Sequence, residues 1–316
     1  MTNGTTGSGW PRIGVMGAGG IGCYFAGMLA RAGAPVTVIA RPRHAEAIAR
    51  DGLRLESLTF DERVPMAASS DPAALSGAAI VLVSVKTVDT EEAARQMRPH
   101  LAAGAVVISL QNGLDNAGRL RALVTNAVFP GVVYAAAEMA GPGHVKHNGG
   151  NMILTGDDLD ADGGRRGLLE GAAAVLARAG IDCRVSADVR ADLWGKLASN
   201  CSYNAVSALA RATCGRMTAD PATRGVMRRV MEEVVAVAAA EGLTLDLEAM
   251  VAHVLRVGQL APNAVSSTFQ DIAAGRRTEI DDLNGAIVRR GAERGIDTPV
   301  NGTLYALVKM LESAAR

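Results

Sequence analysis

The strongest constraint on the fold is a short apolar strand that runs directly into a glycine-rich turn. The sequence predicts this strand over Ile13–Met16, a helix over Cys23–Arg31 and a second, β-branched strand over Pro35–Ala40. The turn between the first strand and the helix fits the pattern G-x-G-x-x-G and consists of Gly17, Ala18, Gly19, Gly20, Ile21 and Gly22. A strand before this pattern and a helix after it form the context in which the pattern binds a dinucleotide.

The glycines of this turn have separate physical roles in such a site. Gly17 permits the tight turn, Gly19 lets the backbone approach a pyrophosphate, and Gly22 lets the helix pack closely on the strand. The first N–H groups of the helix and its partial positive charge attract the phosphates. The alternative interpretation is a glycine turn in an unrelated α/β protein.

The end of the second strand indicates which dinucleotide is bound. An NAD site normally has Asp or Glu here, which accepts hydrogen bonds from the ribose 2′-hydroxyl. In this chain the strand ends at Arg41, Arg43 and His44 follow, and the first acid is Glu46. A guanidinium binds a 2′-phosphate through two hydrogen bonds, whereas a carboxylate repels it. We therefore expect NADPH/NADP+ as the cofactor, with a merely solvated turn as the alternative.

Strands and helices alternate through the first part of the chain. Continuous apolar runs at Ala78–Lys86, Ala105–Gly113 and Val128–Ala137 are typical of strands buried in a parallel sheet. The alternation predicts an α/β fold with a doubly wound parallel sheet, that is, an N-terminal Rossmann domain over residues 11–187. The polar, glycine-rich residues 1–10 before it are expected to be a disordered tail.

The second part of the chain, residues 188–316, has few β-branched runs and is predicted to be an all-α C-terminal domain. Helical spacing of Ala, Leu, Val and Arg is found in five segments: Ala191–Leu209, Thr223–Glu241, Leu247–Val257, Thr278–Arg294 and Thr303–Ala314.

Composition excludes several classes of function. The chain has 32 basic and 32 acidic residues and 3% aromatics, so it lacks the charge and the stacking side chains of a nucleic-acid binder. Four dispersed cysteines, no apolar segment of membrane-spanning length and no secretory signal favour a reduced, cytoplasmic setting. His144 and His147 lack further ligand candidates nearby, and we expect no metal. A homodimer is the commonest closed assembly and is expected here.

The segment from Leu193 carries the residues most suited to chemistry. Lys196, Asn200 and Asn204 follow one another at intervals of four and therefore form one stripe on a helix. Asparagine is a poor helix former, and exposed helix faces are usually rich in Glu, Lys and Arg. The stripe therefore favours a catalytic or substrate-binding face, and the alternative is a polar contact between domains.

With these motifs the chain resembles the ketopantoate reductase family (2-dehydropantoate 2-reductases) over nearly its whole length. The resemblance rests on GAGGIG, VSVK ending at Lys86, QNG at Gln111–Gly113, the K-x-x-x-N-x-x-x-N helix, and S-S-T-F-Q-D-x-x-x-G-R-R-T-E-I-D from Ser266 to Asp281. It implies NADPH-dependent reduction of a 2-oxo acid, with ketopantoate reduced to pantoate in the route to pantothenate and coenzyme A.

The resemblance also implies roles for single residues. Lys196 would donate the proton, and Glu279 would lie beside this lysine and the nicotinamide ribose. The substrate contacts implied are Asn200, Asn204, Ser267 and Asn112, the last of which also borders the cofactor. Further cofactor contacts implied are the turn residues Gly17 to Gly22, Arg41 and Lys86 at the 2′-phosphate, and Ala137 through its backbone near the nicotinamide.

These roles agree with the chemistry of a ketone reduction. A lysine ammonium both stabilises the oxyanion that develops and supplies its proton, which is typically worth ~10²–10⁴-fold in rate. Amides and a hydroxyl hold the substrate in register. A carboxylate at Glu279 would keep the ammonium of Lys196 charged unless the substrate or burial shifts its pKa.

The sequence departs from some members of the family at two positions. Ala264 and Cys214 stand where these members carry asparagines, so another branched 2-oxo acid is an alternative substrate. A 3-hydroxyacid-type dehydrogenase is a second alternative, because it also pairs a Rossmann domain with a Lys/Asn helix. A non-catalytic NADP(H)-sensing module is an alternative of a different class; it would be expected to lose Lys196 or Glu279, and both are present.

Overall fold

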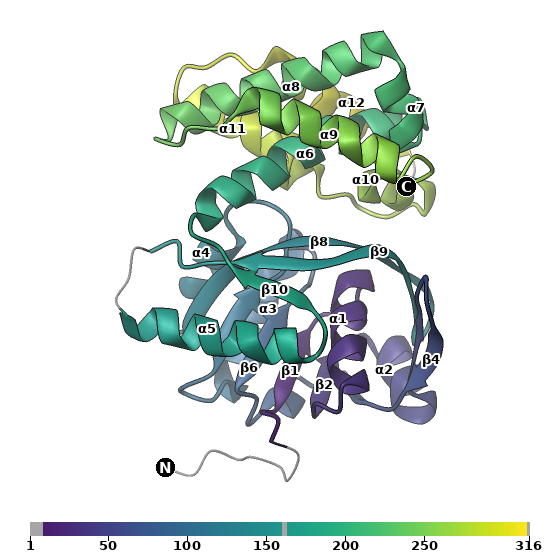
Figure 1. The fold of residues 1–316 in the computed structure, drawn as a ribbon, viewed down its shortest axis with the longest axis vertical. Helices are drawn as coiled ribbons and strands as arrows, with labels where there is room; N and C mark the ends of the chain where they lie inside the picture. Colours follow the sequence, from purple (N-terminus) through teal and green to yellow (C-terminus); the bar gives the residue numbers. More distant parts are fainter. Residues whose placement is uncertain (1–8, 160–162, 315–316) are drawn as a thin grey trace. The chain divides into compact units, whose positions relative to one another are not determined.

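The structure is a computed structural model that describes residues 9–159 and 163–314. The chain divides into two compact units. The first comprises Met1–Gln111 and Asp115–Val189, and the second comprises Asn112–Leu114 and Arg190–Arg316. Each unit has its own hydrophobic core, and each is described separately below (Figure 1). Among the described residues, no helix combines the length and the apolar character needed to span a bilayer.

The first unit is built on a ten-stranded sheet with the order β4-β3-β9-β8-β7-β6-β1-β2-β5, and β10 pairs with β9. Its strands are β1 (Ile13–Met16), β2 (Val36–Ile39), β3 (Leu53–Glu56), β4 (Asp61–Val64), β5 (Ala67–Ser69), β6 (Ile80–Val83), β7 (Val106–Ser109), β8 (Ala127–Gly141), β9 (His144–Thr155) and β10 (Asp182–Val185). Its helices are α1 (Gly20–Arg31), α2 (Pro42–Asp51), α3 (Thr90–Met97), α4 (Asn116–Arg121) and α5 (Gly163–Arg178), with short 3₁₀ helices η1 (Pro72–Leu75), η2 (Thr87–Asp89) and η3 (Arg98–His100).

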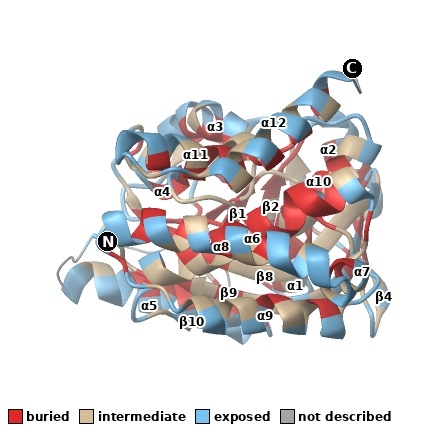
Figure 2. Ribbon diagram, turned by 90° about the horizontal axis from the view of Figure 1, so that it is seen from above, coloured by how far each residue is buried: buried red, intermediate tan, exposed pale blue. Residues whose placement is uncertain are grey.

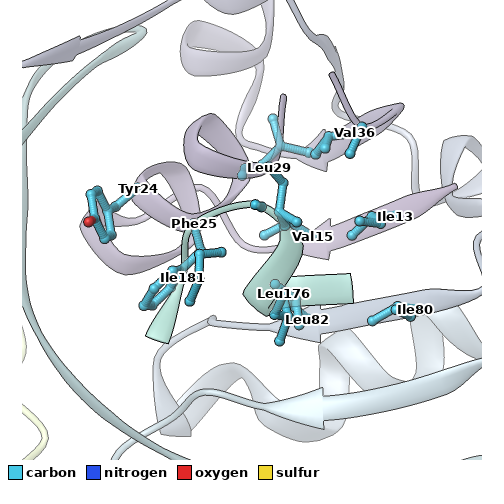
Figure 3. Close-up of a cluster of buried hydrophobic side chains, with 14 of the residues drawn as sticks. Ile13, Val15, Tyr24, Phe25, Leu29, Val36, Ile80, Leu82, Leu176 and Ile181 are labelled. Atoms are coloured by element: carbon cyan, nitrogen blue, oxygen red, sulfur yellow. The ribbon is translucent and has the colours of Figure 1, made fainter. Parts of the chain in front are cut away.

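The central strands are apolar on both faces because both faces are covered. Val15 and Leu82 belong to a core with Phe25 of α1 and Leu176 of α5, on one face of the sheet (Figure 3). The alternate residues of these strands, such as Val81 and Val107, point to the other face of the sheet and belong to a second core with residues of α3 and α4. Since side chains alternate along a strand, helices on both faces require the continuous apolar runs seen in the sequence. The predicted doubly wound Rossmann fold is confirmed.

The sheet is parallel through its centre and becomes antiparallel toward one side. The segment Val128–Ala137 lies within β8, which is parallel to β7 as far as Pro130 and then antiparallel to β9 from Gly131 onward. Pro142 and Gly143 form the turn of this hairpin, and Gly143 has a φ of 65°. Pro followed by a glycine of positive φ is the signature of a type II turn, so the hairpin had a local signal.

The predicted tail meets the fold at its end. The predicted tail comprises residues 1–10, and residues 1–8 of it lie outside the described residues. Trp10 is only 5% exposed, and the Arg178 guanidinium lies 3.9 Å from the centroid of its ring. A cation over an aromatic face is attractive, so Trp10 belongs to the packed domain.

The second unit is helical, as predicted, and is centred on a long helix, α6 (Val189–Ala210). The other helices are α7 (Cys214–Ala219), α8 (Pro221–Ala240), α9 (Leu247–Leu260), α10 (Ser267–Ala273), the 3₁₀ helix η4 (Ile280–Asp282), α11 (Asn284–Glu293) and α12 (Pro299–Ala314). Trp194 and Cys201 of α6 share a core with Val230 of α8 and Ile287 of α11. Buried and exposed residues alternate along α8 and α9, as expected of helices that cover a core on one side (Figure 2).

The predicted helix over Thr278–Arg294 is wrong in its first part. Glu279 precedes the 3₁₀ turn η4, and the α-helix begins only at Asn284. The break lies at Leu283, whose φ and ψ are both −105°. Helical spacing of the apolar residues continues across this break, which is why periodicity alone did not reveal it.

The beginning of α1 lies in close contact with the strands beneath it because its glycines have no side chains. A Cβ on Gly22 would overlap the Gly17 carbonyl oxygen and the Ser84 hydroxyl, and one on Gly20 would overlap the Ala137 carbonyl oxygen. Gly17 itself has a φ of 112°, which favours glycine. Gly19 differs, since a Cβ there would meet no atom within 4 Å and its φ of −77° suits any residue.

We predict that Gly22→Ala lowers the free energy of unfolding by about 1–3 kcal/mol, because the helix must move away from β1. The matched change Gly19→Ala should leave unfolding within ~0.5 kcal/mol of the parent. Denaturant unfolding of both variants measures the difference. Equal stability of the two would contradict the close contact described for Gly22.

Candidate functional site

In the first unit, three loops that follow parallel strands lie at one edge of the sheet. The registers Met16↔Ile39 and Met16↔Val83 place the carboxyl ends of β1, β2 and β6 side by side. Ligands of open α/β sheets bind at this edge. The glycine turn follows β1, Arg41 follows β2, and Lys86 follows β6 as the residue before η2. The structure therefore brings together the cofactor residues predicted from these three strands.

The glycine turn leaves room for a ligand at one position. The open space at Gly19 lies at the N-cap of α1, which has no side-chain cap, so the first N–H groups of this helix are not covered by one. Uncapped N–H groups at a helix N-terminus attract phosphate. Ala137 is placed at the same turn, because its carbonyl oxygen lies against Gly20. This agrees with the backbone contact expected of Ala137.

The end of β2 carries positive charge that no described residue neutralises through an ion pair. The side chains of Arg41 and Arg43 form no ion pair or hydrogen bond with any described residue, and both residues are exposed. Burial, with help from the charges of Arg43 and Arg41, lowers the pKa of His44, so this imidazole is neutral. Its Nδ1 is buried and has no hydrogen-bond partner among the described residues. The corner is suited to an anion with several oxygen acceptors, such as a 2′-phosphate.

In the second unit, α6 places Lys196 in a desolvated position. Burial lowers the pKa of Lys196 from 10.5 to about 8. A shift by burial was the exception allowed for the support expected from Glu279, and burial is the cause of the lowered pKa here. An amine whose pKa lies close to the working pH is suited to proton transfer.

A chain of side-chain hydrogen bonds connects three of the predicted site residues within this unit. Asn112 donates from Nδ2 to Oε2 of Glu279, at 3.1 Å. Asn200, one turn after Lys196 on α6, donates from Nδ2 to Oδ1 of Asn112, at 3.4 Å. Asn112 thus has its oxygen toward α6 and its nitrogen toward the carboxylate, which fixes the orientation of its amide.

Asn204 is the next residue of the stripe and is 6% exposed. Its side-chain amide forms no hydrogen bond with any described residue, although buried amides are normally bonded. Its backbone oxygen accepts a hydrogen bond from the hydroxyl of Ser266, which caps α10. This contact brings Ser267, the exposed first residue of α10, to the same part of α6. An amide in this condition is available to a bound ligand.

The two positions that depart from the family pattern are neighbours in space. Cys214 donates its backbone N–H to the carbonyl oxygen of Ala264, at 2.8 Å. Cys214 is buried, and burial raises the pKa of its thiol, so it is a small, uncharged group. This part of the second unit therefore lacks the amides that some family members carry there.

Two of the histidines have other environments than the sequence interpretation assumed. His147 lies within β9, is 8% exposed and stacks on Tyr24 with ring centroids 4.0 Å apart. His144 bonds to Glu56 at 2.9 Å. The described residues contain no group of three or more side chains suited to hold a metal. His253 on α9 is exposed, as the sequence interpretation expected, and partial desolvation and the nearby charge of Lys196 lower its pKa. No local sequence pattern predicts that His253 lies near Lys196.

Comparison with known proteins identifies the relationship. The family described as Ketopantoate reductase PanE/ApbA matches residues 13–158, and its C-terminal part matches residues 188–312. The chain is 33% identical to the 2-dehydropantoate 2-reductase of Halobacterium salinarum, covering 95% of this chain and 99% of that protein. It is 34% identical to the enzyme of the same name from Archaeoglobus fulgidus, covering 96% and 98%.

A solved structure agrees with these sequences. The PanE/ApbA family ketopantoate reductase from Ralstonia eutropha JMP134 is 47% identical, with a TM-score of 0.88 and coverage of 96% of this chain and 99% of that one. The two family matches together cover both units, and the similarity extends along almost the entire chain. The chain therefore belongs to the ketopantoate reductase family, a family of oxidoreductases.

Proposed function

We propose that the chain is an NADPH-dependent reductase that converts 2-dehydropantoate (ketopantoate), a 2-oxo acid, to the 2-hydroxy acid pantoate. The two relatives compared above are named 2-dehydropantoate 2-reductase, and their similarity covers 95% and 96% of this chain. Pantoate formation belongs to the synthesis of pantothenate, the precursor of coenzyme A. The protein is further proposed to act in the cytoplasm as a homodimer.

The residues of the first unit fit NADPH. The open position at Gly19 gives the pyrophosphate access to the N-terminus of α1. Arg41 and Arg43 after β2 offer unneutralised guanidinium groups to a 2′-phosphate, and Lys86 follows β6, which pairs with the other side of β1. When bound, NADPH supplies the hydride that reduces C2 of the substrate.

The residues of the second unit act on the substrate. The Lys196 ammonium binds the ketone oxygen, stabilises the negative charge that develops on it and donates the proton. Asn200, Asn204 and Ser267 hold the polar groups of the substrate in register. Glu279 orients the amide of Asn112 and, in the proposed site, would hold the nicotinamide ribose. Lys196 carries most of this assignment, because desolvation lowers its pKa to about 8 and it lies on α6 one turn before Asn200.

A second candidate substrate class is another branched 2-oxo acid. The neighbouring residues Cys214 and Ala264 favour it, because neither side chain can hydrogen-bond a substrate hydroxyl as an amide does. Assaying ketopantoate beside 3,3-dimethyl-2-oxobutyrate, which lacks the hydroxyl group, distinguishes the two. Turnover of only the second compound would keep the reaction class and replace the substrate.

We predict that Lys196→Met lowers kcat for ketopantoate reduction by ~10²–10⁴-fold, because the proton donor is lost. The dissociation constant for NADPH should change by less than about threefold. Lys146→Met, at an exposed lysine of β9, is the matched control and should retain kcat. NADPH oxidation followed by absorbance gives kcat, and fluorescence titration gives the affinity. NADPH binding by the parent without turnover of any 2-oxo acid would favour a sensing module instead.

The pKa of Lys196 predicts a pH dependence. Reduction requires the ammonium, so kcat/KM for the 2-oxo acid should be level below about pH 8 and fall tenfold per pH unit above it. Oxidation of the 2-hydroxy acid requires the neutral amine and should rise through the same range. In Lys196→Arg the guanidinium does not deprotonate here, so the alkaline decline should disappear. A decline that persists in this variant would assign the ionisation to another group.

The unneutralised arginine at the end of β2 predicts cofactor preference. Arg41→Met should raise KM for NADPH by ~10–100-fold, because a charge-assisted hydrogen bond to the 2′-phosphate is lost. KM for NADH should change by less than about threefold. Arg98→Met, at an exposed arginine of η3, serves as the control for a lost surface charge. Equal effects on both cofactors would remove Arg41 from the 2′-phosphate site.

A further inference from the structure

Glu279 stands on backbone that is not held by a regular helix. The segment between α10 and η4 has no repeating hydrogen bonds, and Glu279 itself has φ and ψ of −99° and 20°. Its carboxylate accepts the hydrogen bond from Asn112 that continues to Asn200. A carboxylate in this position needs support from elsewhere, since irregular backbone without tertiary contacts is mobile.

That support comes from a buried carboxylate on α12. Glu312 is 5% exposed, and one of its oxygens, Oε1, accepts hydrogen bonds from both the backbone N–H and the hydroxyl of Thr278, at 2.7 and 2.5 Å. The Thr278 hydroxyl oxygen in turn accepts the N–H of Ile280, at 3.2 Å. The residues on both sides of Glu279 are therefore tied to one carboxylate.

Lys309 connects Glu312 to a second acidic residue, Asp281. The contacts of Glu312 and Lys309 with Thr278 and Asp281 are called the clamp below. The Lys309 ammonium lies 3.0 Å from Oε2 of Glu312 and 3.0 Å from Oδ2 of Asp281. Asp281 also accepts a hydrogen bond from the Tyr305 hydroxyl, at 2.8 Å. Lys309 and Tyr305 lie one turn apart on α12, so this helix holds Asp281 from two positions.

The charges of the clamp are stable at neutral pH. Burial opposes ionisation of Glu312, but the hydrogen bonds from Thr278 and the ion pair with Lys309 outweigh it and lower the pKa of this carboxyl. The ion pairs with Asp281 and Glu312 likewise outweigh burial and raise the pKa of Lys309. Both partners are therefore ionised, and removal of one would take an ion pair from the other, although Lys309 would keep Asp281 and Glu312 would keep Thr278.

We propose that Glu312 and Lys309 are positioning residues for Glu279, and that they act on the reaction only through this carboxylate. The inference rests on the proposed function, in which Glu279 borders the reacting groups. The clamp sets the place of Thr278 and Asp281, and these set where the Glu279 carboxylate meets the amide of Asn112. A displacement of about 1 Å at a reacting site can cost ~10²-fold in rate.

The test is a double-mutant cycle on kcat and on KM for NADPH with Glu312→Gln, Glu279→Gln and the double variant. Glutamine keeps the shape of the side chain but presents an amide to Lys309 and loses the ion pair. We expect Glu312→Gln to lower kcat about tenfold in the parent and less than twofold in the Glu279→Gln background. Equal factors in the two backgrounds would overturn the inference, since a purely structural role is additive.

Glu233→Gln is the matched control, because Glu233 holds the other end of the same helix. Its carboxylate accepts the N–H groups of Val300 and Asn301, at 2.8 and 2.9 Å, and has no bond to the Glu279 segment. It should lower the unfolding temperature and leave kcat within twofold of the parent. A tenfold loss of kcat here would show that any loosening of α12 suffices, and would contradict a specific role for Glu312.

Lys309→Met provides a second cycle with Glu279→Gln and decides the question if Glu312→Gln does not fold. This variant keeps the bonds between Thr278 and Glu312 and removes the ion pairs of Lys309 with Glu312 and Asp281, so we expect a loss of kcat of about three- to tenfold that disappears without Glu279. Turnover by the parent with additive cycles would overturn this inference alone. Absence of turnover of any 2-oxo acid by the parent would overturn both it and the proposed function.

Discussion

The first unit depends on the absence of side chains where α1 begins. Gly20 and Gly22 let the helix lie directly against the carbonyl oxygens of Ala137 and Gly17. This contact fixes the direction of α1, and with it the direction of the N–H groups at its N-terminus. The parallel pairing of β1 with β2 and β6 then places Arg41 and Lys86 at the same edge of the sheet. Close backbone packing thus accounts for Gly20 and Gly22, whereas a Cβ on Gly19 would meet no atom within 4 Å.

In the second unit, polar side chains lie on a largely buried helix, α6, and therefore need hydrogen-bond partners within the protein. Most of the described residues of α6 are buried, and its apolar residues form the centre of the helical core. Asn200 gains a partner in Asn112, and Asn112 gains one in Glu279, so each amide is bonded without the help of water. Lys196 remains desolvated on this helix, and its lowered pKa is the measure of that desolvation.

Features with a local or periodic cause could be predicted from the sequence. The buried strands could be predicted, since short apolar runs such as Ile80–Val83 are typical of strands that are buried on both faces. The glycine turn and its flanking strand and helix could be predicted as well. The β8–β9 hairpin was missed because apolar residues continue through the change from parallel to antiparallel pairing. Asn112 and Glu279 are 167 residues apart, and no spacing rule relates them. Glu312 looks like an ordinary helix acid until the fold brings Thr278 against it.

The unbonded amide of Asn204 has a consequence for the choice of ligand. Apolar walls discriminate weakly, because a missing methylene group in a ligand removes little binding energy. An amide without a partner acts differently, since a ligand that covers it without offering a donor or an acceptor leaves it unsatisfied, at a cost of ~1–3 kcal/mol. Close homologues of the right substrate would thus be rejected for what they lack rather than for their size. In the proposed site, Asn204 would therefore select ligands by their polar groups, and enlarging the pocket would not remove this selection.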